Sequence, residues 1–339
     1  MDKNAQFKRV LVTGGAGYVG SALVPKLLDA GYEVVVYDLM LFGSDVLPKG
    51  NPALTVVEAD IRDTERFARA VEGADAVIHL ACISNDPSFE LDEALSTTIN
   101  LDCFEPMVRA SRAAGVRRFV YASSSSVYGI SEVPDVTEEH PLLPLTLYSK
   151  YKAMCETILA GYQAPDFTCV TIRPSTVCGY APRLRLDLTV NILTNHAINN
   201  RKITVFGGEQ MRPNIHMDDM VDLYLMLLRL PDETIAGRVF NAGYRNLKVA
   251  DIAGIVRDVV SEEFPEGSPI EILRTPTDDN RSYHVNSDKI RRALGFEPKR
   301  TVEDAVRDLC RAFRAGRIPN SLTDDAYYNV RTMKARSIA

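Results

Sequence analysis

The chain has 339 residues, of which 46% are hydrophobic and 25% charged, a composition that suits one large or two ordinary domains and argues against intrinsic disorder. The net charge is -6 and no long cluster of Lys or Arg occurs, so we expect neither a nucleic-acid partner nor binding to an anionic membrane surface. No stretch approaches the roughly twenty apolar residues of a membrane span, and no hydrophobic leader follows Met1, so we expect a cytoplasmic protein. The six cysteines show no CxxC spacing and the five histidines no HExxH spacing. We therefore expect no metal site and reduced, structural cysteines.

Short runs rich in Val and Ile alternate with segments of helical periodicity through the first half of the chain. The predicted strands are Val10–Thr13, Glu33–Tyr37, Leu54–Glu58, Ala76–Leu80, Arg118–Ala122 and Cys169–Ile172. The predicted helices between them are Val19–Ala30, Thr64–Val71, Thr97–Ala114 and Tyr148–Ala160. This alternation predicts an α/β fold with a Rossmann-type, doubly wound parallel sheet that is covered on both faces.

A smaller, interleaved C-terminal substrate domain is expected beyond the point where this alternation breaks down, past Pro174. The helix-like Met217–Leu230 and the strand-like Arg238–Asn241 are expected to return to the first domain. The predicted limits are 1–178 for the dinucleotide-binding domain with 213–243 returning to it, 179–212 and 244–318 for the second domain, and 319–339 for a tail. The tail has no clean period, so we expect it to be frayed rather than an arm on a partner subunit.

A glycine-rich turn, Gly14-Gly15-Ala16-Gly17-Tyr18-Val19-Gly20, separates the first strand from the first helix. Glycine permits the tight turn, the close approach of a pyrophosphate and the packing of helix on strand, although a plain glycine-rich turn would look the same. The second strand ends in Asp38, whose carboxylate would bind both adenosine ribose hydroxyls and repel a 2'-phosphate. The pattern therefore favours NAD over NADP.

Two later strand ends extend this nucleotide site. Asp60 could accept a hydrogen bond from the adenine amino group while Ile61 packs on the ring, or it could belong to a helix N-cap run with Asp63. Leu80-Ala81-Cys82 closes the fourth strand with residues small enough for a dinucleotide to pass closely.

Tyr148 and Lys152 are four residues apart and therefore lie on one face of a helix. A tyrosine is a poor base at neutral pH, but a lysine ammonium one turn away and a cationic nicotinamide both favour the phenolate. Tyr148 is thus a candidate acid and base, although such a pair also arises by chance. The serine run Ser123–Ser126, which follows a predicted strand, offers hydroxyls that can orient a substrate alcohol or carbonyl.

In this order, the glycine turn, Asp38, Asp60, the serine run with Val127-Tyr128-Gly129 and the Tyr148/Lys152 pair resemble the extended short-chain dehydrogenase/reductase family, and within it the nucleotide-sugar epimerases and dehydratases. The resemblance covers about residues 8–315. It implies that Tyr148 is the catalytic base, that Lys152 grips the nicotinamide ribose and that Ser124 assists Tyr148. The expected cofactor-binding residues are Gly14, Gly17, Tyr18, Val19, Gly20, Asp38, Asp60, Ile61, Leu80, Ala81, Cys82, Asn100, Ser123, Tyr148 and Lys152.

The resemblance also implies that the substrate is a nucleotide-diphosphate sugar. It assigns Asn191 and Arg212 to the phosphates and the Asp279–Tyr283 stretch to the nucleotide. Arginine suits this task because its planar fork binds phosphate bidentately, although ordinary surface charge is the alternative for Arg183, Arg185 and Arg212. The expected substrate-binding residues are Ser84, Ser124, Ser125, Ser126, Thr176, Arg183, Arg185, Asn191, Arg212, Asp279 and Arg281.

Within the family, dehydratases carry Asp-Glu where this chain has Ser125 and Ser126, and decarboxylases and 3,5-epimerases carry Glu or Cys at the second position. We therefore expect an NAD-dependent nucleotide-sugar 4-epimerase, in which a transient 4-keto sugar takes its hydride back. A 4-dehydrogenase or 4-keto reductase is the alternative, because Thr176 and Ser84 stand where the family often has Asn and Lys, and the run Pro182–Leu188 resembles members that act on unusual sugars such as heptoses. A non-catalytic NAD-sensing regulator is a third reading. A homodimer through the helices at 97–114 and 148–160 is also implied.

Overall fold

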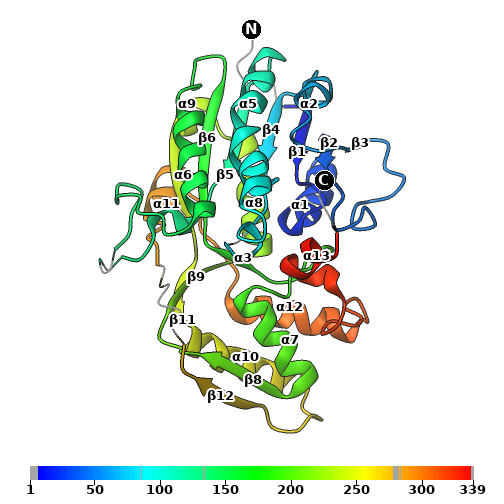
Figure 1. Cartoon of the computed structure of the whole chain (residues 1–339), viewed down its shortest axis with the longest axis vertical. Coiled ribbons are helices and arrows are strands. Elements are labelled where there is room, and N and C mark those ends of the chain that lie inside the picture. The colour runs from blue at the N-terminus through cyan, green and yellow to red at the C-terminus, as the bar shows by residue number, and fades with distance from the viewer. Residues whose placement is uncertain are drawn as a thin grey trace.

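Seven parallel strands form the sheet in the upper part of the molecule (Figure 1). The computed structural model describes residues 7–336 except 85, 132, 134, 278–281 and 283. The strands of this sheet are β1 (Arg9–Thr13), β2 (Glu33–Asp38), β3 (Leu54–Glu58), β4 (Ala76–His79), β5 (Arg118–Ala122), β6 (Thr168–Pro174) and β10 (Arg238–Ala242). Their order is β10-β6-β5-β4-β1-β2-β3, so the strands wind outward in both directions from β1 and β4. This confirms the predicted α/β class with a doubly wound parallel sheet.

Alternating apolar side chains bury both faces of the sheet. In β1, Val10 and Val12 lie in one hydrophobic core and Leu11, between them, lies in the other. The first core includes α1 (Tyr18–Asp29) and α8 (Met217–Arg229), whereas the second includes α2 (Thr64–Val71), α5 (Phe104–Ala113) and α6 (Leu147–Ala160). Because parallel strands are stable only when both faces are covered, this two-sided packing fixes the sheet and the carboxyl ends of its strands.

The strands predicted for the first half are all present at nearly the predicted bounds, but the predicted helix Thr97–Ala114 is not continuous. Helix α4 (Glu93–Thr97) runs into a π-helical turn at Thr98–Asp102, and α5 begins only at Phe104. A π-helical turn inserts one residue into the helical register. Here the turn holds Asn100, whose side chain reaches the backbone of Ile83.

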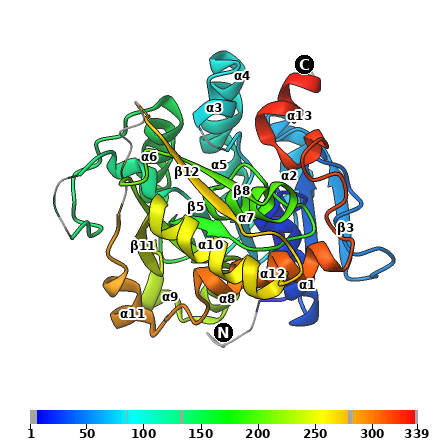
Figure 2. The ribbon, with the colours of Figure 1, turned by 90° about the horizontal axis from the view of Figure 1, so that it is seen from below.

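A smaller part of the molecule lies below the sheet (Figure 1). It contains the parallel pair β8 (Lys202–Phe206) and β12 (Glu271–Thr275), with α7 (Thr189–Asn200), α10 (Val249–Glu263) and α12 (Val302–Arg314) around a third core. Figure 2 shows α10 and α12 side by side in this part. A three-stranded sheet of β7 (Thr176–Cys178), β9 (Met211–His216) and β11 (Arg245–Lys248) lies between the two parts.

The chain passes between the two parts more than once. Helix α8 packs in the upper core and β10 pairs with β6, although α7 and β8 precede them in the lower part. The residue limits given above for the two domains stay a prediction. The shorter elements are α3 (Asp86–Phe89), α9 (Asp232–Ile235), α11 (Asp288–Leu294), α13 (Asn329–Ala335) and the 3-10 turns Ser125–Tyr128 and Asp325–Tyr327.

The expectation of a frayed tail over residues 319–339 is wrong as far as Arg336. Ser321 and Asn329 are both 4% exposed, and the Leu186 backbone N–H donates to the Tyr327 carbonyl at 2.9 Å. Tyr328 packs in the first core, where its aromatic ring supplies the apolar area that holds the segment down. The segment therefore closes back on its own chain.

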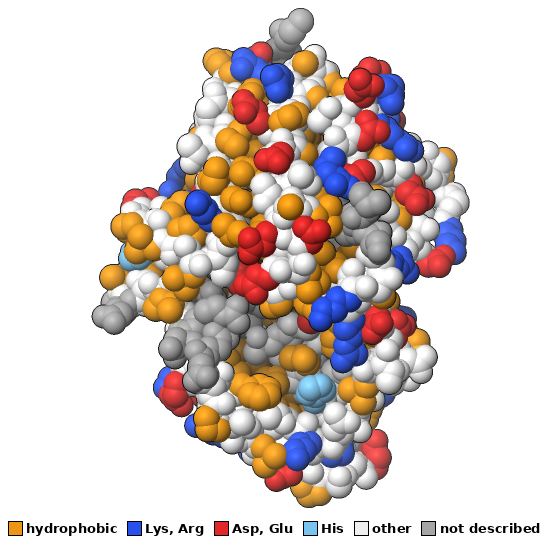
Figure 3. Space-filling view, viewed as in Figure 1, with side chains coloured by type: hydrophobic (Ala, Val, Ile, Leu, Met, Phe, Trp, Pro, Cys, Tyr) orange, Lys and Arg blue, Asp and Glu red, His pale blue; other side chains and the backbone are white. Residues whose placement is uncertain are grey.

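The helices, the surface charge and the cysteines can be compared with what was expected from the sequence. None of the helices in the described part of the chain is long and apolar enough to cross a membrane. On the face in Figure 3, basic and acidic side chains occur together over both parts of the molecule. The six cysteines are all free, and burial raises the pKa of Cys103, Cys155, Cys169, Cys178 and Cys310 to about 12.

Candidate active site

A cavity of about 640 Å³ runs along the carboxyl ends of the sheet strands, beside the point where strand order reverses between β1 and β4. The residues singled out from the sequence that line it are Gly14, Gly17, Tyr18, Val19, Gly20, Asp38, Asp60, Ile61, Leu80, Ala81, Cys82, Ser84, Ser123, Ser124, Ser125, Ser126, Tyr148, Lys152, Thr176, Arg183, Arg185 and Arg212. Asn100 and Asn191 do not line it. Asp279 and Arg281 lie outside the described residues.

The glycine turn leaves no room for side chains. A Cβ added to Gly14, which has φ +71°, would lie 2.7 Å from the Ala81 nitrogen, and one added to Gly20 would lie 2.2 Å from the Gly14 carbonyl oxygen. Helix α1 begins at Tyr18, within this segment, with Gly17 as its N-cap, no side-chain cap and no acidic residue in its first turn. Its positive end and its first N–H groups therefore face the cavity, as binding of a pyrophosphate requires.

Asp38 is held in place at the end of β2. Its two carboxylate oxygens accept hydrogen bonds from the Ala16 N–H at 2.9 Å and the Met40 N–H at 2.8 Å. Burial raises the pKa of Asp38, and these two hydrogen bonds oppose the increase. A carboxylate at this place fits the ribose hydroxyls of NAD and disfavours the 2'-phosphate of NADP.

Asp60 is paired rather than used as a helix cap. Arg62 donates to both of its carboxylate oxygens, with the shortest contact at 2.6 Å, whereas the N-cap of α2 is Asp63, which accepts from the Arg66 N–H. Burial alone would raise the pKa of Asp60, but the hydrogen bonds from Arg62 outweigh it and the pKa is lowered. Asp60 thus stays charged beside Ile61 in the lining of the cavity.

Helix α6 carries Tyr148 and Lys152 one turn apart. The Lys152 ammonium donates to the Ala122 carbonyl at 2.7 Å and lies 5.9 Å from the centre of the Tyr148 ring. Burial raises the pKa of Tyr148, while Arg185 and a hydrogen bond with Ser124 act in the opposite direction. Burial outweighs them, so the protein by itself holds Tyr148 as the neutral phenol at neutral pH.

A buried ion pair that was not predicted from the sequence contacts the serine run through Ser123. Arg173 of β6 pairs with Glu156 of α6 at 2.6 Å, and the two side chains are 6% and 7% exposed. The Ser123 hydroxyl donates to Glu156, and Arg173 donates to the Tyr128 hydroxyl at 2.7 Å. The available signal was a charged residue inside the otherwise uncharged strand Thr168–Pro174.

The side-chain amides of Asn100 and Asn191 form hydrogen bonds with other groups of the protein. Asn100 accepts from the Ile83 N–H at 2.8 Å and donates to the Ile83 carbonyl at 2.9 Å. Asn191 is fully buried, accepts from the Gly179 N–H at 3.0 Å, and donates to the Tyr18 hydroxyl and the Arg185 carbonyl. Both amides therefore position loops that line the cavity.

Two of the candidate arginines are buried, so ordinary surface charge does not describe them. Arg183 is 4% exposed, lies 3.6 Å from the centre of the Phe42 ring and donates to Asn329 at 2.5 Å. Burial lowers the pKa of Arg183 to about 9. Arg185 is 8% exposed and donates to the Ser84 hydroxyl at 3.2 Å.

Asn329, from the C-terminal segment, also lines the cavity and was not singled out from the sequence. Its amide donates to the Ser84 hydroxyl at 3.0 Å, and its backbone N–H donates to Asp187 at 3.1 Å. No motif signalled this contact, because the two partners are separated by most of the chain.

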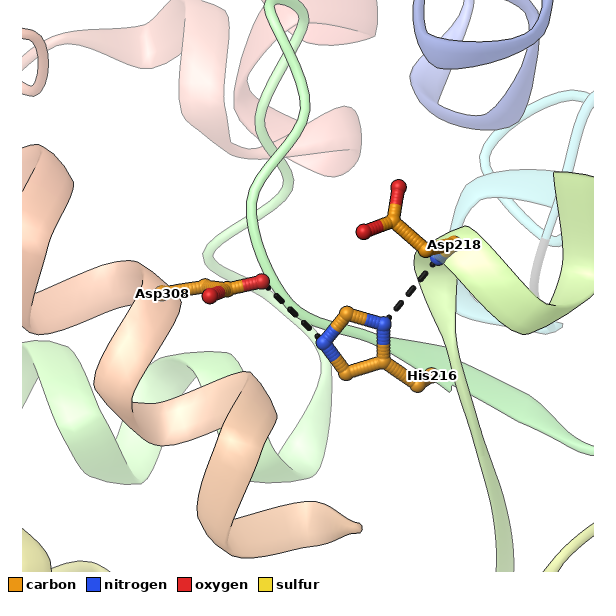
Figure 4. Close-up of side chains that lie close together, drawn as sticks. All are labelled: His216, Asp218 and Asp308. Carbon is orange, nitrogen blue, oxygen red and sulfur yellow. Dashed lines mark hydrogen bonds and ion pairs between the residues drawn. The ribbon is translucent and has the colours of Figure 1, made fainter. Parts of the chain in front are cut away.

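One cluster outside the cavity has the composition of a metal site, namely His216, Asp218 and Asp308 (Figure 4). His216 is the N-cap of α8, and its Nδ1 accepts from the Asp218 backbone N–H at 3.1 Å. Its Nε2 lies 3.1 Å from an Asp308 carboxylate oxygen on α12. Nδ1 already accepts a hydrogen bond and Nε2 faces a carboxylate. The cluster is therefore explained by a structural role, in which His216 caps α8 and links it to α12.

The Rossmann sheet, the glycine turn and Asp38 together define a dinucleotide-binding protein, and the residues present fit NAD. A family model described as "NAD dependent epimerase/dehydratase family" matches residues 10–243, and the chain belongs to this family of NAD-dependent enzymes.

Relatives within the family differ in activity. The chain is 29% identical over 323 residues to a UDP-glucose 4-epimerase of Lactobacillus helveticus, covering 88% of this chain and 94% of the relative. It is 27% identical over 309 residues to a dTDP-glucose 4,6-dehydratase of Streptomyces griseus, covering 88% and 91%. Its structure resembles that of DesIV, a dTDP-glucose 4,6-dehydratase from Streptomyces venezuelae with NAD bound, with a TM-score of 0.80, 25% identity and coverage of 91% and 98%. The chain is therefore similar to nucleotide-sugar-modifying enzymes of more than one activity.

Proposed function

We propose that the protein is an NAD-dependent nucleotide-sugar 4-epimerase that acts through a transient 4-keto sugar. The observation that carries the proposal is a single cavity lined by Tyr148, Lys152 and Ser124, by the glycine turn, and by Arg185 and Arg212. Ser125 and Ser126 replace the acid and base that elimination of water would need. Similarity to the Lactobacillus 4-epimerase supports the proposal as well.

Bound NAD supplies a reversible hydride acceptor, and the chain supplies positions and proton transfer. Gly14, Gly17 and Gly20 admit the pyrophosphate, and Asp38 holds the adenosine ribose. Lys152, anchored on the Ala122 carbonyl, is placed to grip the nicotinamide ribose. Ser124 hydrogen-bonds Tyr148 and orients it as acid and base toward a sugar hydroxyl.

The buried arginines extend the proposal to the phosphates. Arg185 is close enough to Tyr148 to affect its pKa, which favours a role near the sugar and its diphosphate. Arg183 lies within electrostatic reach of Asp38 and Tyr18, which favours a role at the cofactor side of the cavity. We propose Arg212, on β9, for the substrate phosphates.

A 4-dehydrogenase or 4-keto reductase is the second candidate. Ser84 favours this candidate, because it stands where the family often has a lysine. Its hydroxyl instead accepts hydrogen bonds from Arg185 and Asn329. A non-catalytic NAD sensor is a third reading, and retention of Tyr148, Lys152 and Ser124 in one cavity argues against it.

Tyr148→Phe tests whether the site is catalytic. The variant should bind NAD as the wild type does and lose turnover of nucleotide sugars. Tyr151→Phe is the matched control, because Tyr151 lies on the same helix and hydrogen-bonds Thr97. Full turnover by Tyr148→Phe would reject the proposed chemistry.

Two further expectations stay predictions. A homodimer through the helical faces at 97–114 and 148–160 is consistent with Met154, which is 40% exposed on α6, and light scattering checks it. The cytoplasmic location is checked by cell fractionation.

A further inference from the structure

A row of hydroxyl groups connects Tyr148 to the carboxylate of Asp86, which also lines the cavity. Ser124, which hydrogen-bonds Tyr148, lies 2.8 Å from the Ser126 hydroxyl. Ser126 lies 2.8 Å from the Ser149 hydroxyl, and Ser149 lies 3.1 Å from the Thr146 hydroxyl. Thr146 donates to the Asp86 carboxylate at 2.6 Å. We propose that Ser124, Ser126, Ser149 and Thr146 carry a proton between the Tyr148 phenol and the Asp86 carboxylate.

Each oxygen in the row can donate one hydrogen bond and accept another at the same time. A serine or threonine hydroxyl has one proton and two lone pairs, and its proton rotates to suit its partner. Ser124 also accepts from the Ser126 N–H at 3.1 Å, and Thr146 accepts from the Ser149 N–H at 3.3 Å, which uses the second lone pair of each. In the structure Ser149 donates to Ser126 and Thr146 donates to Asp86, so the Ser126 and Ser149 protons must turn before all four hydroxyls point toward Asp86.

Helix capping accounts for only part of this arrangement. Thr146 is the N-cap of α6, which explains its bond from the Ser149 backbone N–H. Capping does not require the Ser149 hydroxyl to reach Ser126, on a different segment, nor Thr146 to reach Asp86 at the start of α3. Ser149 is 2% exposed, so its hydroxyl is committed to these partners.

The relay rests on the proposed function, because oxidation of a sugar hydroxyl passes one proton to Tyr148. In the relay, the O–H bond of Tyr148 breaks as its proton passes to Ser124, each hydroxyl passes its own proton onward, and the last proton forms an O–H bond on Asp86. Tyr148 becomes phenolate and Asp86 becomes a carboxylic acid, so charge and atoms balance. Asp86 lines the cavity and can pass the proton to water.

The relay matters most when ligands fill the cavity and cover Tyr148. An epimerase returns its proton to the sugar in each cycle, whereas a dehydrogenase must release one proton for every sugar oxidised. The relay therefore supplies the step that the second candidate function needs, and in the epimerase it ionises Tyr148 once, before the first sugar is oxidised.

For an enzyme that releases the keto sugar, the test follows proton release and NADH formation together by stopped flow, with a pH-indicator dye, after enzyme saturated with NAD is mixed with UDP-glucose. An epimerase keeps its proton, so for it the tyrosinate readout described below is the test. Ser149→Ala breaks the row at its centre and should slow proton release by roughly tenfold or more. Ser149→Thr keeps the hydroxyl and should restore the wild-type rate. Thr157→Ala, an exposed change on the same helix, is the matched control.

In Asp86→Asn, the relay and simple electrostatics predict opposite changes in the rate at which Tyr148 loses its proton. The Asp86 charge raises the pKa of Tyr148, so if charge were its only effect, removing it would speed loss of the tyrosine proton. The relay predicts slower loss instead, with Glu90→Gln, an exposed carboxylate next to α3, as the control. Faster release in Asp86→Asn, or a Ser149→Ala rate equal to that of Thr157→Ala, would overturn the proposal.

A second readout separates the relay from the proposed function. Tyrosinate absorbance after a pH jump, measured in NAD-loaded enzyme without sugar and with Tyr148→Phe as the reference, reports the ionisation of Tyr148 alone. If the wild type oxidises no sugar, the proposed function fails, and slower tyrosinate formation in Ser149→Ala still supports the relay. Equal rates in the two proteins would reject it.

Discussion

The ion pair between Arg173 and Glu156 should contribute strongly to the stability of the fold beneath the serine run, and Glu156→Gln measures that contribution to the free energy of unfolding. The variant keeps the shape of the side chain but leaves the buried Arg173 guanidinium without its counter-charge. Breaking one partner of a buried pair costs about 3–5 kcal/mol. The entropy of unfolding for 339 residues is about 0.7 kcal/mol/K, so the melting temperature should fall by roughly 4–7 °C.

Differential scanning calorimetry of the wild type and Glu156→Gln measures this shift. Glu209→Gln is the control, because Glu209 also accepts from a cation, Lys248, at 2.8 Å but on the surface, with 70% of its side chain exposed. Exposed pairs contribute little, so this control should melt with the wild type. If Glu156→Gln also melts with the wild type, the reasoning about the buried pair is wrong.

Three further predictions concern the cofactor turn, the adenine end and the C-terminal segment. Gly20→Ala should weaken NAD binding by roughly tenfold, because its Cβ meets the Gly14 carbonyl and overpacking costs about 1–3 kcal/mol; calorimetric titration checks this, and Gly254→Ala, with nothing within 4 Å of its Cβ, should bind normally. The pKa of Asp60 is lowered from 3.8, so its contribution to stability is present above that pH and is lost as pH falls below it; the stability difference between wild type and Asp60→Asn should therefore shrink in acid unfolding measurements, and a constant difference would contradict the assignment. Asn329→Ala should cost about 1–3 kcal/mol in urea unfolding, because it removes an acceptor from the buried Arg183, and no loss would show that the C-terminal contact is unimportant.

Local patterns were enough to predict the sheet, the glycine turn, Asp38, the serine run and the Tyr148/Lys152 pair, whereas the substrate residues Ser84, Thr176 and Arg212 were expected only from the family resemblance. The strands of the doubly wound sheet are short apolar runs between helical segments, and their carboxyl ends meet at one edge for geometric reasons. Gly14, Asp38, Ser124 and Tyr148 follow such strand ends or begin the next helix, so the sequence placed them together on the same side of the sheet.

Contacts between distant segments could not be predicted in this way. Asn329 reaches Ser84 only because the C-terminal segment folds back, and no periodicity marks that return. The side-chain amide of Asn191 points at the Gly179 N–H rather than into the cavity, a direction set by packing of the second part of the molecule. The sequence did not indicate the π-helical turn at Thr98–Asp102, because the helix before it spans only Glu93–Thr97, too short a run for the shift in the apolar pattern to be recognised.

The most direct test of the proposed activity is mass-resolved chromatography of a panel of UDP- and dTDP-sugars incubated with the protein and excess NAD. We expect a product of unchanged mass and shifted retention, without accumulation of NADH, and loss of that product in Tyr148→Phe. A product lighter by two hydrogens with matching NADH would replace the epimerase by the dehydrogenase. Loss of water from the sugar would contradict the conclusion drawn from Ser125 and Ser126.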